Sequence, residues 1–271
     1  MKIAFLHTLS SNQALFTPYT EDLQRKRPGV TTTHHVDEDL LKNARKIASE
    51  EDRARVTTQV HQALSSMIGS GANVDFVVCT CSTIGDMAER YTSSAPVLRV
   101  DQPMGLRLGN PSLGDDAEQT TSSHIPVLRV DRPMADCAVG YSVIHVLAAL
   151  ESTLEPTKEL LDKCASTAHT HPRIHMTVVP EAWSHFQQGD QKAYIQTIAD
   201  YIQEKYSNTE SSQDSVIVLA QASMSPAAEL LLIPEQQSSL GDKDKDTGMA
   251  ELPRILTSPS ICVDYLAGLR D

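Results

Sequence analysis

A cysteine at the end of a short apolar run is the residue of this chain best placed to do chemistry. Residues 74–79 read Val-Asp-Phe-Val-Val-Cys, and Thr80, Cys81, Ser82 and Thr83 follow. This pattern predicts a buried β-strand that ends in a polar turn. If Ser82 or Thr83 caps the following helix, free backbone N–H groups and the positive end of the helix dipole converge on Cys81. We therefore expect this thiol to favour the thiolate and to move protons beside an anion-binding turn.

The other cysteines indicate neither a disulfide framework nor a metal site. Cys79 lies two positions before Cys81, and free cysteines are often inert, buried strand residues. This spacing is not the C-x-x-C of redox sites, and no second pair completes a zinc site. With Cys137, Cys164 and Cys262, the chain has five irregularly spaced cysteines. We expect reduced thiols and a cytoplasmic location.

Composition excludes several classes of function. The chain has 271 residues, 40% of them hydrophobic, and a formal net charge of −12. A long polyanion is repelled by such a charge, so we expect no nucleic-acid partner. The apolar runs are too short for a membrane span or a signal peptide, so we expect no membrane association. A homo-oligomer is compatible with this composition.

Short apolar strands alternate with amphipathic helices along the chain. This order is typical of βαβ units with parallel sheets. The expected strands cover residues 3–6, 74–78, 143–147, 174–179, 214–219 and 254–256, and the expected helices cover residues 37–47, 50–68, 84–91, 155–165 and 191–206.

A second strand-to-helix turn resembles the one at Cys81. Residues 214–223 form an apolar run followed by Gln221, Ala222 and Ser223, and the pair Ser225-Pro226 is typical of a helix start. Ligands of open α/β sheets bind beyond the carboxyl ends of the strands. Two such turns that face each other across a cleft are suited to hold a small anion from both ends.

One segment of the chain is repeated almost literally. Residues 93–104 recur as residues 123–134, with Pro96 and Pro126 at an offset of 30. We expect the second copy to supply the core strand and the first to form an edge strand or a surface excursion. Residues 236–251 are predicted to form a mobile, polar insertion, and the alternating Asp242, Asp244 and Asp246 fit a calcium loop poorly.

Several other residues are weaker candidates. His35 is a secondary acid/base candidate, and the spacing of His169, His171 and His175 fits a metal site only loosely. No metal is therefore expected. Trp183 fits packing at a lobe edge or a cleft wall.

Two charged positions near the repeat have separate expectations. Arg129 alternates with apolar residues and is expected on a solvated face. Asp131 follows at a strand end, where it could line the cleft.

Residues 3–12, the Cys81-Ser82-Thr83 turn and residues 126–134, 150–161 and 216–224 together resemble the aspartate/glutamate/hydantoin racemase superfamily. The resemblance implies two similar α/β lobes that each carry one cysteine. One thiol removes a proton from the substrate's α-carbon and the other returns it on the opposite face. The resemblance also implies that no metal or other cofactor is needed.

Cys81 matches the first-lobe cysteine of that superfamily, but the second-lobe position holds Gln221. An amide does not titrate, so a symmetric two-thiol mechanism is not available. Cys81 can still protonate an enolate from one face, or add to an activated double bond and release an isomer. Gln221 would then hold a carboxylate or enolate oxygen by hydrogen bonds, beside backbone N–H groups near Ser223.

The sequence thus predicts an α/β protein of two pseudo-symmetric lobes with the active site between them. Residues 1–138, completed by a helix at 260–271, form the first lobe and residues 139–259 the second. The predicted function is a cofactor-independent, cysteine-dependent enzyme that acts on a small carboxylate, namely an amino acid, a hydantoin or a substituted dicarboxylate. It acts by racemase-like isomerisation or one-sided proton transfer. Cys81 is the catalytic residue, and the expected substrate-binding residues are Thr8, Asn12, Ser82, Thr83, Thr153, Gln221, Ala222 and Ser223.

Three alternatives are left open by the sequence. The first is a lyase or decarboxylase. The second is a non-catalytic relative that binds a small acid, since the loss of one thiol is also expected of a pseudoenzyme. The third is a thiol hydrolase, which is weaker because no cysteine–histidine–acid set is evident.

Overall fold

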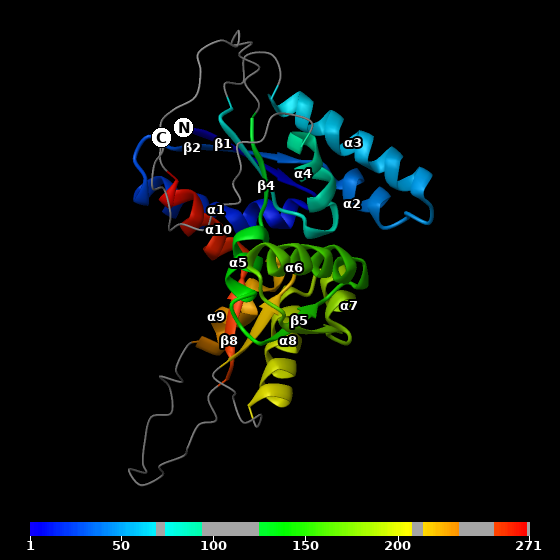
Figure 1. The fold of residues 1–271 in the computed structure, drawn as a ribbon, viewed down its shortest axis with the longest axis vertical. Coiled ribbons are helices and arrows are strands. Elements are labelled where there is room, and N and C mark those ends of the chain that lie inside the picture. The colour runs from blue at the N-terminus through cyan, green and yellow to red at the C-terminus, as the bar shows by residue number, and fades with distance from the viewer. Residues whose placement is uncertain (69–73, 94–124, 208–213, 233–251, 270–271) are drawn as a thin grey trace.

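Two four-stranded parallel sheets carry the fold (Figure 1). The computed structural model describes residues 1–68, 74–93, 125–207, 214–232 and 252–269. The first sheet has the order β2-β1-β3-β4, and the second has the order β6-β5-β7-β8. The predicted fold class is therefore confirmed, and the two sheets have the same topology. Their strands are β1 (Lys2–His7), β2 (Thr31–Val36), β3 (Phe76–Cys79), β4 (Val127–Arg129), β5 (Val143–Ala148), β6 (Arg173–Val178), β7 (Ser215–Leu219) and β8 (Arg254–Thr257).

Helices cover the faces of both sheets. The central strands are buried on both faces, which is why β3 and β7 read as continuous apolar runs. The helices are α1 (Ser10–Lys26), α2 (Glu38–Ala44), α3 (Glu50–Ile68), α4 (Gly85–Ser93), α5 (Arg132–Ala138), α6 (Leu154–Ala168), α7 (Ala182–Gln187), α8 (Gln191–Tyr206), α9 (Ser225–Leu232) and α10 (Ser258–Gly268), with 3₁₀ turns η1 (Ser82–Ile84), η2 (Glu151–Thr153) and η3 (Ala222–Met224). No helix of the described residues is both long and apolar enough to cross a membrane.

The two lobes exchange their last helices. α5 follows β4 of the first sheet, but Met134 and Ala135 lie in a core cluster with Ile144 and Val146 of the second sheet. Conversely, α10 follows β8 of the second sheet, and Cys262 packs in a cluster with strands of the first. Figure 1 shows α10 beside α1 at the junction. The division of the chain at residue 138 stays a prediction.

The expected elements largely agree with the structure, and their differences have physical causes. The helices expected at 50–68 and 191–206 have the bounds of α3 and α8. Three elements, α1, β2 and α7, were not predicted from the sequence. β2 reads Thr-Thr-Thr-His-His-Val and lies at a sheet edge, where its half-exposed faces need no apolar run. The insertion at 236–251 and the first repeat copy at 93–104 lie wholly or almost wholly outside the described residues.

Arg129 is buried, which contradicts the expectation of a solvated face. Its side chain is 1% exposed and makes a bidentate ion pair with Asp131, at 2.7 Å and 2.9 Å. Burial opposes ionisation of Asp131, but the adjacent guanidinium outweighs it and holds the pKa of this carboxyl below its ordinary value. A Cβ at Gly85 would lie 2.9 Å from Arg129 Nε, so the start of α4 requires a glycine. Neither charged residue lines the cavity described below.

His7 is a buried histidine whose tautomer follows from its partners. Thr80 Oγ1 donates to the carbonyl oxygen of Leu6 at 3.0 Å, so it accepts from His7 Nδ1 at 2.9 Å. His7 Nε2 is then left to accept from His34 Nδ1, also at 2.9 Å. Burial and the neighbouring His34 lower the pKa of His7 from 6.5 to about 3. The imidazole is therefore neutral in the folded protein near neutral pH.

The second repeat copy supplies β4, as predicted, and this leads to a test of the duplication. Val127, Leu128 and Arg129 pair with β3, and α5 follows directly. Deletion of residues 95–124 should therefore leave a soluble protein with the same circular dichroism spectrum and a cooperative thermal transition, because long excursions add little loop entropy. An insoluble or non-cooperative deletion variant, beside a well-folded full-length chain, would show that both copies belong to the core.

The neutral His7 should make the protein less stable in acid. Below pH 6.5 the unfolded chain binds a proton that the folded chain excludes, so the free energy of unfolding falls as the pH decreases toward 3. Between pH 6.5 and pH 5 this residue should cost about 2 kcal/mol. Urea unfolding at several pH values should show a smaller loss for His7→Gln than for wild type. Thr33→Gln gives a control, because it changes an exposed, non-titrating residue of the same strand and should keep the wild-type pH dependence.

Candidate active site

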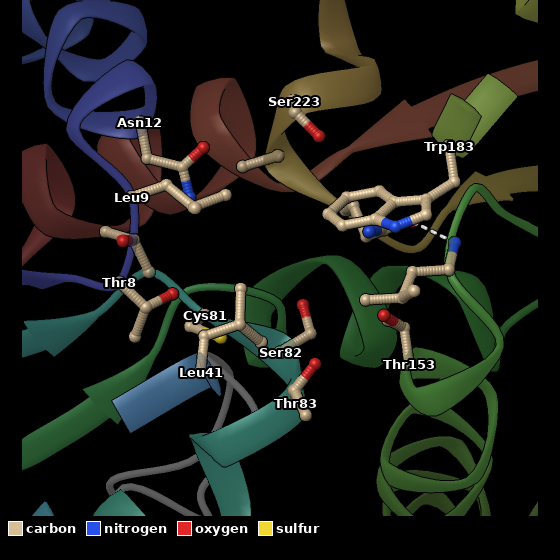
Figure 2. Close-up of a pocket in the computed structure, with 14 residues that line it drawn as sticks. Thr8, Leu9, Asn12, Leu41, Cys81, Ser82, Thr83, Thr153, Trp183 and Ser223 are labelled. Carbon is tan, nitrogen blue, oxygen red and sulfur yellow. Dashed lines mark hydrogen bonds between the residues drawn. The ribbon is translucent and has the colours of Figure 1, made fainter. Parts of the chain in front are cut away.

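A cavity lies where the carboxyl ends of the two sheets face each other (Figure 2). The space is about 400 Å³, part of it open to solvent. All nine residues expected at the site line it, and five more join them. The lining residues are Thr8, Leu9, Asn12, Leu41, Thr80, Cys81, Ser82, Thr83, Leu150, Thr153, Trp183, Gln221, Ala222 and Ser223.

Cys81 and Gln221 occupy equivalent positions in the two lobes. Each is the second residue after the third strand of its lobe, and each precedes a 3₁₀ turn in an extended conformation. Their backbone angles are φ −107°, ψ 111° and φ −124°, ψ 137°. The pseudo-two-fold therefore places a thiol on one side of the cavity and an amide at the matching place on the other.

The surroundings of Cys81 both oppose and favour its ionisation. Burial is the largest effect and raises the pKa of this thiol above its ordinary value. The side chains of Thr8 and Thr83, and the backbone N–H groups of Thr83 and Ile84, favour the thiolate and offset part of that rise. The N–H groups of Thr83 and Ile84 thus act on the sulfur in the expected direction, although Cys81 itself is the N-cap of the 3₁₀ turn. The expectation of a predominant thiolate is wrong, because desolvation outweighs these donors.

Gln221 is held by the backbone of its own lobe. Its Oε1 accepts from the N–H of Ala149 at 2.6 Å and of Leu150 at 3.1 Å. With the carbonyl oxygen engaged in this way, the NH₂ group is the end left for a ligand. An amide in this orientation donates hydrogen bonds and does not accept a proton. Gln221 therefore matches Cys81 in place but not in chemistry.

The hydroxyl groups around the cavity differ in how they are used. The buried hydroxyl of Thr153 has no hydrogen-bond partner among the described residues, whereas that of Thr8 makes no regular hydrogen bond but acts on the Cys81 thiol. Because buried polar groups rarely stay unpaired, Thr153 is suited to contact a ligand. Ser82 Oγ instead donates across the lobes to the carbonyl oxygen of Ala220 at 2.9 Å, and Ser223 pairs with the hydroxyl of Tyr194 at 2.9 Å.

Five lining residues were absent from the expected site, and four of them form apolar walls. Leu41 comes from α2 and Trp183 from α7, while Leu9 and Leu150 precede α1 and η2. Figure 2 shows Cys81, Ser82 and Thr83 of one lobe facing Thr153 and Trp183 of the other. The cleft-wall interpretation of Trp183 is confirmed. β2 and β6 hold equivalent positions in the two sheets, so Leu41 in the helix after β2 corresponds to Trp183 in the helix after β6. This correspondence could not be seen from the sequence, because β2 was not predicted.

The described lining residues carry no acidic, basic or histidine side chain. Cys81 is therefore the titratable group of the lining. His35 is exposed on β2 and does not line the cavity. Within the described ranges, no three His, Cys, Asp or Glu residues gather as metal ligands, and His169, His171 and His175 are no exception.

Several solved structures have the same fold as this chain. No protein-family model matches the sequence, and no curated protein does either. Glutamate racemase from Francisella tularensis, solved with D-glutamate, has a TM-score of 0.58 at 11% identity over 98% of this chain and 78% of that one. The chain has the two-lobed α/β fold of this racemase.

Two other structures extend the comparison beyond glutamate racemase. Allantoin racemase from Klebsiella pneumoniae has a TM-score of 0.52 at 14% identity, over 98% of this chain and 86% of that one. An aspartate racemase homologue from Pyrococcus horikoshii has a TM-score of 0.51 at 9% identity, over 98% and 96%. At these identities the similarity to the three solved structures establishes the fold alone.

The donors around Cys81 can be tested through the reactivity of the thiol. Thr8→Val and Thr83→Val each remove a hydroxyl that favours the thiolate while keeping the side-chain shape. Each should slow alkylation of Cys81 by iodoacetamide near neutral pH several-fold, because the reaction requires the thiolate. Peptide mapping at a series of pH values measures this, with the exposed Cys137 as internal reference.

Ser223→Ala is the control for these variants, since its hydroxyl is engaged by Tyr194. It should leave the alkylation profile of Cys81 unchanged. Identical profiles for wild type and both threonine variants would contradict the proposed donor set. Labelling of Cys81 at neutral pH as fast as that of a cysteine in a short unstructured peptide would contradict the raised pKa.

Proposed function

We propose that this protein is a cofactor-independent enzyme that transfers a proton at the carbon next to a carboxylate or a related acyl group. Cys81 is the acid/base residue and acts from one face of that carbon. The observation that carries the proposal is the pairing of Cys81 with Gln221 at pseudo-equivalent positions of a shared cavity. The racemase fold of the chain supports this class of reaction.

The resting state of Cys81 indicates the direction of proton transfer. A thiol whose pKa is raised by burial is protonated at neutral pH, so it is ready to donate a proton. It would protonate the α-carbon of an enolate formed in the cavity and become a thiolate, which solvent then reprotonates. Loss of CO₂ from a substituted dicarboxylate forms such an enolate directly. The protonated thiol therefore favours the decarboxylase alternative over abstraction of an α-proton.

The enolate oxygen would be held by neutral donors. Thr153 offers an unpaired hydroxyl, and Gln221 offers its NH₂ group. Donors that are already fixed stabilise developing charge without reorganisation during the reaction. Thr83 and the 3₁₀ turn that follows Cys81 would then stabilise the thiolate left after the transfer.

Gln221 sets the stereochemical limit of the reaction. Racemisation needs a titratable group on each face of the α-carbon, and an amide donates hydrogen bonds only. The proposed reaction therefore introduces or removes a proton on one face. A ligand-binding protein without catalysis is the rival proposal, and the two differ in whether Cys81 is required for turnover or only lines the cavity.

The proposed function can be tested by proton NMR in heavy water with amino acids, hydantoins and substituted malonates. Wild type should introduce solvent deuterium at one face of one substrate class. Cys81→Ser should lower the rate by about 10²-fold or more, the typical contribution of a positioned acid or base. Cys79→Ser is the matched control two residues away and should change the rate little. Gln221→Cys should add exchange at the second face.

Two results would contradict this proposal. Efficient racemisation of both enantiomers by wild type, unaffected by Gln221→Ala, would mean that another residue acts as the second base. Ligand binding with no Cys81-dependent turnover on any member of the panel would support the non-catalytic rival.

A further inference from the structure

A positive charge lies beside the cavity, although the described lining has none. The guanidinium of Arg45 lies over the indole of Trp183, with its carbon 5.3 Å from the ring centroid. Trp183 belongs to α7 of the second lobe and lines the cavity, whereas Arg45 follows α2 of the first lobe. This contact therefore joins the two lobes beside the site.

The position of Arg45 is set by the helix that also supplies Leu41. The N–H of Arg45 donates to the carbonyl oxygen of Leu41 at 3.0 Å and closes the last turn of α2. Residues four apart share one face of a helix, so Arg45 lies one turn beyond a residue that lines the cavity. Leu41 is buried and Arg45 is exposed. The guanidinium thus marks the solvent side of the Leu41 wall.

The guanidinium of Arg45 is available to bind a ligand. Within the described part of the chain Arg45 takes part in no ion pair or hydrogen bond through its side chain, in contrast to Lys42 of the same helix, which pairs with Asp39. Cation–π contacts at exposed sites are weak, so the guanidinium can leave the indole when a better partner arrives. A carboxylate is such a partner, because it matches the planar donor fork in two parallel hydrogen bonds.

The charge of the protein makes such a residue necessary for an anionic ligand. The chain has a formal net charge of −12, and the cavity lining in the described residues is neutral. A carboxylate that enters this cavity leaves water without meeting a counter-charge, which is unfavourable. A cation at the entrance offsets this cost.

We propose that Arg45 is a specificity-determining residue that recognises a carboxylate group of the ligand at the mouth of the cavity. The guanidinium moves from the Trp183 indole to the carboxylate as the ligand binds. Trp183 then contacts the apolar or planar remainder of the ligand, next to Leu41. This inference rests on the proposed function only in taking the ligand to be a carboxylate. It does not require that Cys81 transfers a proton.

The chain provides its own reporter for this proposal. Trp183 is the one tryptophan among the 271 residues, so intrinsic tryptophan fluorescence comes from the cavity wall alone. Iodide, an anionic quencher, should quench it more effectively in wild type than in Arg45→Gln, by about twofold in the quenching constant. The neutral quencher acrylamide should not show this loss. Lys42→Gln removes the same charge from the same helix and should behave as wild type.

Ligand recognition is tested with matched probes in the same assay. Phenylacetate and glutarate are compared with phenylacetamide and glutaramide, which have nearly the same shapes without the carboxylate charge. Wild type should bind each carboxylate about tenfold more tightly than its amide, as expected for hydrogen bonds to a charged group. The preference should be lost in Arg45→Gln and reduced in Arg45→Lys, because an ammonium lacks the planar fork.

The outcomes separate this inference from the proposed function. An unchanged carboxylate preference in Arg45→Gln, or no response of Trp183 to either carboxylate, would overturn the role of Arg45. The same titrations in Cys81→Ser measure binding without turnover. An Arg45-dependent preference there, together with no Cys81-dependent deuterium exchange in wild type, would support the inference and contradict the proposed function.

Discussion

A hydrogen bond from the hydroxyl of Ser82 joins the two lobes beside Cys81 and Gln221, and so fixes the two sides of the cavity relative to each other. The hydroxyl donates to the carbonyl oxygen of Ala220 at 2.9 Å, so the residue after Cys81 is bound to the residue before Gln221. The buried Arg129 supports the same junction, because its guanidinium donates to the carbonyl oxygen of Pro156 in the second lobe at 3.3 Å. Removing one partner of a buried ion pair is far more costly than the pair's net contribution, so Arg129 and Asp131 fix this geometry rather than add stability.

The pseudo-two-fold explains why a second thiol could stand at Gln221 and why the amide changes the chemistry. The two turns have similar backbone angles, and the lobes that carry them have the same strand order. Symmetry of the backbone therefore persists where symmetry of the side chains is lost. Gln221 turns its oxygen to the N–H groups of Ala149 and Leu150. The carbonyl oxygen of the amide thus binds the backbone of its own lobe, and its NH₂ group is left as a hydrogen-bond donor.

Strands that are buried on both faces could be predicted from the sequence because they need uninterrupted apolar runs. β3 and β7 fulfil this condition, and the turns after them led to Cys81 and Gln221. β2 could not be found in this way, since an edge strand of threonines and histidines has no apolar run. The burial of Arg129 could not be predicted from the sequence either. It depends on the ion pair with Asp131 and on packing against the second lobe, and neither is visible in a local sequence pattern. Because β2 was not predicted, Leu41 in the helix after it was not recognised as a residue that lines the cavity.

In the proposed function, the recognition of charge is separate from the transfer of the proton. Desolvation inside the cavity raises the pKa of Cys81, whereas a fixed cation beside the sulfur would lower it by favouring the thiolate. The described lining has no such cation. Arg129 reaches the carbonyl oxygen of Ser82 at 3.5 Å but is paired with Asp131, whereas the exposed guanidinium of Arg45 lies over Trp183. A positive charge at the entrance can attract an anion while water screens it from the thiol. A neutral interior with a cationic mouth is therefore consistent with a thiol that acts first as an acid.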